Sequence, residues 1–394
     1  MNMQGQAQEK IWNSKFIFSW LANFFAFTTM YYLMSTIPLY TTEILEGNKS
    51  DVGMLFALYA VAGVLARPLA GRLLDSSGRM KVAWASLLLL FLSVFAYSWA
   101  VGMMALLALR FVHGIFWGFS TTSLATVATD VIPVKRRGEG IGYFGLSMSF
   151  AMLLGPWLGL TVLHSFDYDV MFLVVSVIAA LSCACLLGIR YEGKAVKGGQ
   201  SGGFLERKIL PYATIVFFMA VGYSAILSFI VLFSQELGIE NASIFFFVNA
   251  IAVIISRPCA GKMADKHGPA GTMCIGFATF FLTFICLYFA QGLEMLIGAA
   301  LLMGIGFGIL YSLCFVLSIN AVAPARRGMA NGTILTAFDI GFSVGSMGLG
   351  AVSMMMGLRS MYLLCAGIVM IPWVIYYLHD MRGQQSKADL LKTI

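Results

Sequence analysis

The feature that most constrains this chain is a series of long, nearly uncharged apolar stretches. An α-helix needs about 20 apolar residues to cross the hydrocarbon core of a bilayer. Twelve stretches of this length follow one another along the sequence, over residues 16–40, 52–74, 82–102, 104–129, 140–163, 170–189, 209–234, 243–264, 272–291, 294–322, 329–355 and 358–378. The sequence therefore predicts an all-α integral membrane protein with twelve transmembrane helices.

Composition excludes the other broad classes. Apolar residues make up 60% of the chain and charged residues only 11%, whereas about 25% of a soluble domain is charged. The chain is thus neither an ordinary water-soluble enzyme nor a disordered protein, which needs low hydrophobicity and high charge. Its 41 glycines suit membrane helices that pack through small residues.

Lys and Arg are distributed unevenly among the connections between these stretches. Twenty of the 25 lie in the two ends, in residues 190–208 and in alternate loops, whereas only Lys49 and Arg359 lie in the other loops and three lie within spans. Basic connections stay in the cytoplasm, so we expect a multi-pass plasma-membrane protein with both termini cytoplasmic and the first span retained. The net charge of +7 then reflects topology, and no nucleic acid is expected as a partner.

The two halves of the chain repeat each other at an offset of 190 residues. Residues 67–78 (RPLAGRLLDSSG) and 257–268 (RPCAGKMADKHG) are identical at six of twelve positions. The offset recurs without gaps at Gly114/Gly304, Gly118/Gly308 and Gly155/Gly345. We therefore expect a six-helix bundle over residues 1–189, a polar linker over 190–208, and a second, pseudo-symmetric bundle with a short cytoplasmic tail over 209–394. Parallel repeats of this kind place a binding site near the midplane, between the halves.

Three motifs carry a family resemblance. The loop 71–79 (GRLLDSSGR), Arg110 four residues before Gly114, and Gly155-Pro156 with Gly159 together resemble the major facilitator superfamily. The third motif resembles that of the twelve-span drug/proton antiporter branch, although Ala151 and Leu160 stand where its other glycines fall. The resemblance covers nearly the whole chain.

The resemblance implies a conformational latch formed by Asp75, Arg79 and Asp130, with a merely solvated loop as the alternative. Gly78 within the loop can adopt positive φ at little cost. In the second half Asp265 repeats Asp75, but Pro269 and Asn320 replace the other two charged residues. We therefore expect gating to depend on the first half.

The glycines of the exporter-like motif permit two interpretations. Gly155, Pro156 and Gly159, with Gly345 in the second half, would let spans 5 and 11 pack closely at the interface between the halves and rock there, as the resemblance implies. Ordinary small-residue packing within a half is the alternative. Pro156 removes one intrahelical hydrogen bond, which neighbouring helices can absorb in a membrane.

Four ionisable residues stand out because charges inside a membrane are costly and usually functional. Arg110 lies toward the outer leaflet, where it either serves proton transfer or extends to the interface, and His113 one turn later could relay a proton. Asp339 is the only acid near the middle of a span, about 15 Å of helix from its basic end. The family's architecture places spans 2 and 11 side by side, so Arg67 is expected within salt-bridge reach of Asp339.

The repeat extends this reasoning to Arg257. It repeats Arg67, while Ser149 repeats Asp339, so Arg257 should face a neutral residue. Because an unpaired buried Arg is expensive, we expect Arg257 to reach water in a cavity or an anionic substrate group, with capture by backbone carbonyls and Ser149 as the alternative. Asn23, Trp117 and Tyr223 are further candidate cavity residues.

These observations favour a transporter over an enzyme or a receptor. No GxxxxGK[ST] motif for ATP, no HExxH motif and no Cys/His metal spacing occur, and no cofactor is expected. We predict a monomeric, proton-coupled exporter of small lipophilic or amphipathic molecules, in which Asp339 couples transport to protons and a static Arg67–Asp339 bridge is the alternative. Export of a specific metabolite, such as a carboxylated metallophore, and nutrient uptake are the other possibilities.

Overall fold

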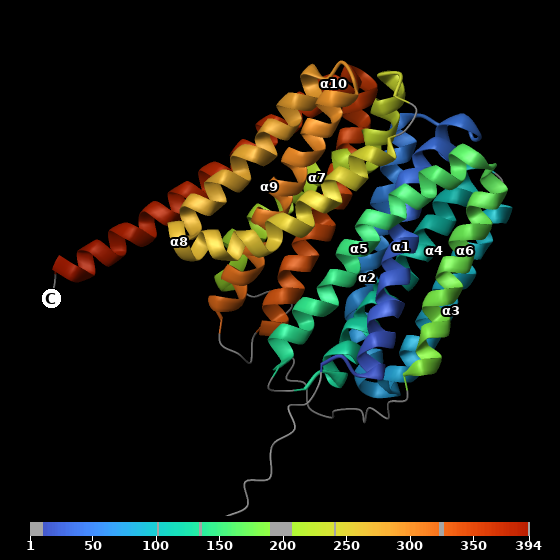
Figure 1. Cartoon of the computed structure of the whole chain (residues 1–394), viewed down its shortest axis with the longest axis horizontal. Helices are drawn as coiled ribbons and strands as arrows, with labels where there is room; N and C mark the ends of the chain where they lie inside the picture. Colours follow the sequence, from blue (N-terminus) through green and yellow to red (C-terminus); the bar gives the residue numbers. More distant parts are fainter. Residues whose placement is uncertain are drawn as a thin grey trace, which may run out of the picture.

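The computed structural model describes residues 11–100, 102–133, 136–189, 207–239, 242–322 and 327–392, and the described part is helical with short connections (Figure 1). The all-α prediction is confirmed. The α-helices are α1 (Ser14–Glu43), α2 (Lys49–Ser77), α3 (Arg79–Phe95), α4 (Met103–Val131), α5 (Arg137–Ser165), α6 (Tyr168–Cys185), α7 (Leu210–Glu236), α8 (Ser243–Phe289), α9 (Leu293–Asn320) and α10 (Arg327–Lys392). Short 3-10 helices cover Ala96–Trp99, Leu186–Gly188 and Arg207–Ile209.

Two of these helices consist of two arms. α8 breaks at Gly268 (φ 79°) and α10 at Gly357 (φ 80°), in a region of backbone space that glycine enters easily. The described residues contain eleven segments long and apolar enough to cross a membrane, and the last, Gly332–Tyr377, has 46 residues with Gly357 inside it. Since about 20 residues suffice for one crossing, this segment holds two spans, which gives the predicted twelve.

The internal repeat is visible in the packing as well as in the sequence. A Cβ atom added to Gly114 of α4 would lie 2.9 Å from Cβ of Ala62 in α2. A Cβ added to Gly304 of α9 would meet Cβ of Ala252 in α8. Both residues of the second contact are 190 positions after those of the first. The two halves therefore use the same small-residue contacts to bring equivalent helices together.

The two halves lie side by side (Figure 1), α1–α6 in blue to green and α7–α10 in yellow to red. α2 packs against α10, as the family resemblance implies, and α5 packs against α8, as the repeat then implies. α1 also contacts α7. The predicted linker lies almost entirely in 190–206, outside the described residues, and the second half begins at Arg207–Ile209 and α7.

The helices end at two opposite sides of the molecule, the basic face and the opposite face. The basic face is the end where α1 begins at Ser14 and where α2 and the first arm of α8 end near Gly78 and Gly268. The opposite face is the end where α1 finishes at Glu43 and α2 begins at Lys49. Between these ends, large apolar side chains remain exposed on the outside of the molecule, including Leu65, Leu69, Leu88, Val344 and Met347, as lipid-facing surfaces require.

Candidate functional site

An ion pair joins the two halves near the middle of the helices. Arg67 Nη1 of α2 lies 2.5 Å from Asp339 Oδ2 of α10, which confirms the predicted proximity. The two contacting atoms are shielded from water and are not aligned as a hydrogen bond, while 24% and 21% of the respective side chains remain exposed. The pair is thus a close charge–charge contact between two partly exposed side chains, whose contacting atoms are themselves shielded from water.

The pseudo-symmetric contact lacks a carboxylate. Arg257 of α8 donates a hydrogen bond from Nη1 to Ser149 Oγ of α5 at 2.9 Å. Its guanidinium carbon lies 5.8 Å from the ring centroid of Tyr311, within cation–π range. Its Nε is buried and has no hydrogen-bond partner. Arg257 therefore faces the neutral Ser149 that the repeat places there, so the structure shows the alternative stated above, a hydrogen bond to Ser149. It pairs with no acid in the described part of the chain.

Tyrosines connect these two contacts. Tyr311 of α9 contacts Arg257 and is within electrostatic range of Arg67 and Asp339 as well. Tyr31 of α1 and Tyr223 of α7, both buried, interact with Arg257 as well. The Tyr223 hydroxyl donates to Met152 Sδ at 3.4 Å, a weak acceptor. Helices from both halves thus supply hydroxyl groups around one unpaired cation.

Aromatic rings extend this region on the α7–α10 side. The ring of Tyr223 stacks on Phe307 with centroids 4.3 Å apart, and Phe307 stacks on Tyr311 at 5.5 Å. Phe338 of α10 lies 5.7 Å from Tyr311 and 6.1 Å from Tyr223. Tyr223, a predicted cavity residue, is therefore buried in an aromatic cluster beside Arg257.

Arg110 is buried inside the first half. Only 1% of the residue is exposed, so it does not extend to the outer interface. Its guanidinium carbon lies 5.4–5.8 Å from the ring centroids of Phe56, Tyr59 and Tyr97, and Nη2 donates to the Leu33 carbonyl oxygen at 3.4 Å. An aromatic cage inside the first half stabilises this cation.

His113 lies in the same cage. Its Nδ1 is 3.1 Å from the Tyr97 hydroxyl, while its Nε2 and the Tyr59 hydroxyl are buried without hydrogen-bond partners. Tyr59 also interacts electrostatically with Arg67 and Asp339. The cage is therefore electrostatically connected to the ion pair through Tyr59.

The remaining predicted cavity residues, Asn23 and Trp117, are buried within the first half. Asn23 Nδ2 of α1 donates to Ser147 Oγ of α5 at 2.7 Å, so its amide joins two helices. Trp117 of α4 packs edge-on against Phe27 with centroids 4.7 Å apart, and 6.2 Å from Tyr59. Both contribute to packing near the interior.

The glycine motif packs helices within each half, which agrees with the second of the two interpretations and not with packing of span 5 against span 11. A Cβ at Gly155 would lie 2.7 Å from Tyr31 Cβ, and one at Gly159 would lie 3.0 Å from a methyl group of Thr36, both in α1. Gly345 of α10 faces Val221 of α7 in the same way. Pro156 lies inside α5 without ending the helix. The small residues thus hold α5 against α1, and α10 against α7, because neighbouring helices of one half run closest together there.

The contact that does bring glycines together across the halves lies near the opposite face. A Cβ at Gly53 of α2 would collide with the Ser346 carbonyl oxygen of α10, and one at Gly350 would lie 3.3 Å from Gly53 Cα. Lys49 Nζ pairs with Glu236 of α7 at 2.5 Å, and Gln235 donates to Glu43 at 2.9 Å. The halves are therefore closed against each other at this end, through residues that the sequence reasoning did not single out.

Part of the predicted latch is formed at the basic face. Arg79 at the start of α3 pairs with Asp130 at the end of α4. Gly78 adopts φ 92° between α2 and α3, as expected. The side chains of Asp75 and Asp265 lie outside the described part of the structure. The Arg79–Asp130 pair joins α3 and α4, two neighbouring helices of the first half.

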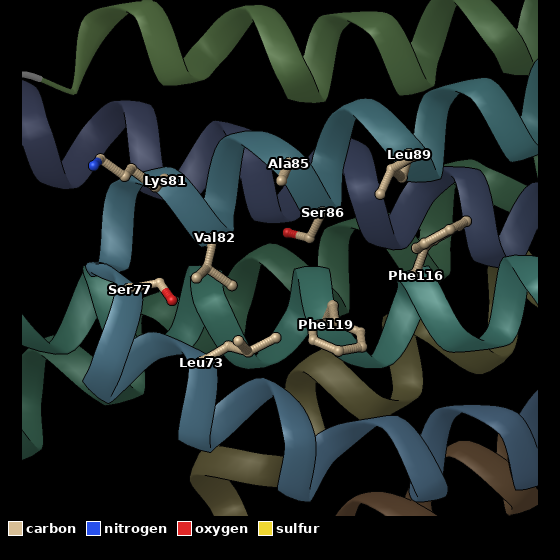
Figure 2. A pocket seen from close by; sticks show the side chains of 9 residues that line it. All are labelled: Leu73, Ser77, Lys81, Val82, Ala85, Ser86, Leu89, Phe116 and Phe119. Atoms are coloured by element: carbon tan, nitrogen blue, oxygen red, sulfur yellow. The ribbon is translucent and has the colours of Figure 1, made fainter.

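The described residues contain no group of His, Cys, Asp or Glu that could hold a metal ion. A cavity of about 380 Å³ lies between α2, α3 and α4 (Figure 2), lined mainly by apolar side chains such as Val82, Leu89 and Phe116, with Lys81 at one end. These helices all belong to the first half, so the cavity is separate from the contacts between the halves.

Comparison with known proteins agrees with this architecture. A family model described as Major Facilitator Superfamily matches residues 19–266 and 212–392. The staphylopine export protein of Staphylococcus aureus is 23% identical over 353 residues, which are 85% of this chain and 88% of that protein. A homologue of the multidrug resistance efflux pump PmrA from Lactococcus lactis subsp. lactis is 24% identical, covering 76% of this chain and 78% of its own. The staphyloferrin B transporter of S. aureus is 21% identical, covering 88% of each chain.

Solved structures share the fold at low identity. The nucleoside transporter NupG (D323A mutant) superposes with a TM-score of 0.78 at 14% identity and covers 93% of this chain and 99% of its own. A POT family transporter in complex with a thioalcohol-conjugated peptide gives a TM-score of 0.80 at 10% identity, covering 93% and 96%. At these identities the similarity concerns the arrangement of helices alone.

Proposed function

The chain belongs to the major facilitator superfamily, and on that premise we propose that it exports small lipophilic or amphipathic molecules in exchange for protons by alternating access. The basic face then lies in the cytoplasm of a plasma-membrane protein with both termini inside, because basic connections are retained there. The protein is a transporter and not an enzyme, since the matching family and the relatives named above are transporters.

The observation that carries the proposal is the Arg67–Asp339 ion pair between α2 and α10. Protonation of Asp339 would remove the negative charge that holds Arg67 and weaken the attachment of one half to the other. Loss of the proton would restore it. The position of the pair between the two halves and the partial exposure of both side chains support such a cycle, since a coupling carboxylate must exchange protons with water.

The test uses purified protein in vesicles with an imposed pH gradient and a panel of amphipathic compounds. Asp339→Asn should abolish gradient-driven accumulation while sparing exchange of labelled for unlabelled substrate at saturating concentration. Glu294→Gln, which alters an acid in the first turn of α9, should leave both activities unchanged. If pH-driven transport survives in Asp339→Asn, the pair is a static bridge, and Arg110 and His113 become the next candidates for the proton site.

A second candidate is the export of one carboxylated metabolite. Relatives named for staphylopine export and staphyloferrin B transport support it, as does the unpaired cation of Arg257. Growth tests separate it from broad efflux. Deletion of the gene should sensitise cells to several unrelated lipophilic compounds under the first proposal and to none under the second.

A further inference from the structure

The two contacts between the halves at mid-membrane are related by the repeat, but only in one of them does the arginine meet a negatively charged side chain. Arg67 and Arg257 are 190 positions apart, and so are their partners Ser149 and Asp339. In the first contact the protein supplies a carboxylate at 2.5 Å. In the second it supplies the hydroxyl group of Ser149 at 2.9 Å. The place that Asp339 occupies beside one arginine is therefore taken by a neutral group beside the other.

The surroundings of Arg257 do not supply the missing charge. Among the described residues it pairs with no acid, and its buried Nε has no hydrogen-bond acceptor. The face of Tyr311 offsets part of the cost of the cation. An unpaired arginine inside a membrane protein remains costly, so an anion that reached it would be bound with little competition from the protein.

The neighbouring hydroxyl groups suit a carboxylate in particular. An arginine presents two parallel N–H groups to the two oxygens of a carboxylate, and here Nε is free while Nη1 is held only by a serine. Tyr31 and Tyr223 lie within electrostatic reach of the same guanidinium. The Tyr223 hydroxyl interacts with the Tyr31 hydroxyl and donates to a thioether sulfur, both weaker acceptors than a carboxylate oxygen.

The aromatic cluster beside Arg257 favours a ligand whose remaining part is flat or apolar. Tyr223, Phe307 and Tyr311 form a stack beside the cation, with Phe338 at its edge. Such surfaces bind flat or apolar groups. A permanently cationic molecule would instead be repelled by Arg257.

We propose that Arg257, Ser149, Tyr31 and Tyr223 anchor the carboxylate of a small amphipathic substrate. This carboxylate would take the place beside Arg257 that Asp339 takes beside Arg67. This proposal deepens the transport function by naming the substrate class, and it rests on that function only in requiring access to the site. It does not depend on proton coupling at Asp339.

The test compares carboxylates with neutral partners of the same shape. Purified protein in lipid nanodiscs is titrated with aromatic and aliphatic monocarboxylates, beginning with indole-3-acetate, and with the corresponding amides, beginning with indole-3-acetamide. Binding is followed by calorimetry and by ligand-induced thermal stabilisation. The best carboxylate should bind roughly 10- to 100-fold more tightly than its amide, as the loss of a charged hydrogen-bonding partner implies.

Ser149→Asp is the decisive variant, because it creates the acid that stands at the equivalent position in the other contact. It should abolish this preference by occupying Arg257 internally. Ser149→Asn has the same shape without the charge and should retain the preference. Arg257→Gln should remove it, whereas Arg359→Gln at the exposed opposite face should not.

Several outcomes would overturn the anchor: no carboxylate in the panel binding better than its amide, or equal effects of Ser149→Asp and Ser149→Asn. An unchanged preference in Arg257→Gln would do so as well. The two proposals fail separately. If neutral compounds are exported but carboxylates show no preference, the anchor is wrong and transport stands. If carboxylates bind through Arg257 but no compound moves with the pH gradient, coupled export is wrong and the anchor stands.

Discussion

Replacing Gly53 with alanine should open the contact between the halves at the opposite face. The added Cβ would collide with the Ser346 carbonyl oxygen and lie 3.1 Å from the Ser346 carbonyl carbon. Both are backbone atoms of α10, so no side-chain rotation can relieve the overlap. Overpacking of this kind costs about 1–3 kcal/mol. If the strain is confined to the closed arrangement, the ratio of closed to open molecules should fall roughly 5- to 150-fold.

Gly71→Ala in the same helix is the matched control. A Cβ there meets nothing within 4 Å, so this variant gains helix propensity, about 0.5–1 kcal/mol, without the collision. The assay is zero-length carbodiimide cross-linking of Lys49 to Glu236, whose charged atoms are 2.5 Å apart, together with hydrogen exchange of the first turns of α2. Cross-linking should fall and exchange should rise in Gly53→Ala alone. Equal behaviour of the two variants would refute the reasoning.

Three further predictions concern the same framework. Lys49→Glu should weaken closure and addition of Glu236→Lys should restore it, with a coupling of only about 0.2–1 kcal/mol because 45% of the Glu236 side chain is exposed; a double variant no better than the single one would argue against the pair. Gly155→Ala should lower the melting temperature through an overlap with α1 that costs about 1–3 kcal/mol, whereas Gly145→Ala, with open space around it, should not, as differential scanning calorimetry can show. Asp75→Asn should reduce transport in vesicles at unchanged expression, and full transport would remove Asp75 from the latch.

The sequence was sufficient for the helices and, together with the family resemblance, for the two mid-membrane contacts between the halves. Apolar length alone located the spans, since backbone groups in lipid must be satisfied within a helix. The offset of 190 then related Arg67 to Arg257 and Asp339 to Ser149, and both contacts are present. A repeat carries this information because equivalent helices of a duplicated fold must meet equivalent neighbours.

The sequence does not reveal which neighbouring helix a small residue faces. Gly155 packs on α1 and not across the halves, and periodicity in an apolar helix does not distinguish these neighbours because every face is apolar. Arg110 could not be placed either, because its cage combines Phe56, Tyr59 and Tyr97 from two other segments. The Lys49–Glu236 pair depends on how the two halves tilt toward each other, which no local pattern encodes.

The charges at mid-membrane also bear on whether a proton and an acidic substrate move in the same direction or in opposite directions. With Asp339 ionised, Arg67 is neutralised and Arg257 remains to bind one carboxylate. With Asp339 neutral, a second arginine is released near Tyr311, and electrostatics alone would strengthen binding of the anion. Export by antiport requires the opposite effect, so loss of the Asp339 charge must move Arg257 away from Ser149. Asp339→Asn mimics the protonated state. Under antiport this variant should therefore bind indole-3-acetate more weakly than the wild type. Tighter binding would mean that proton and acid travel together, and the carrier would then take up acids, with the Arg257 anchor intact.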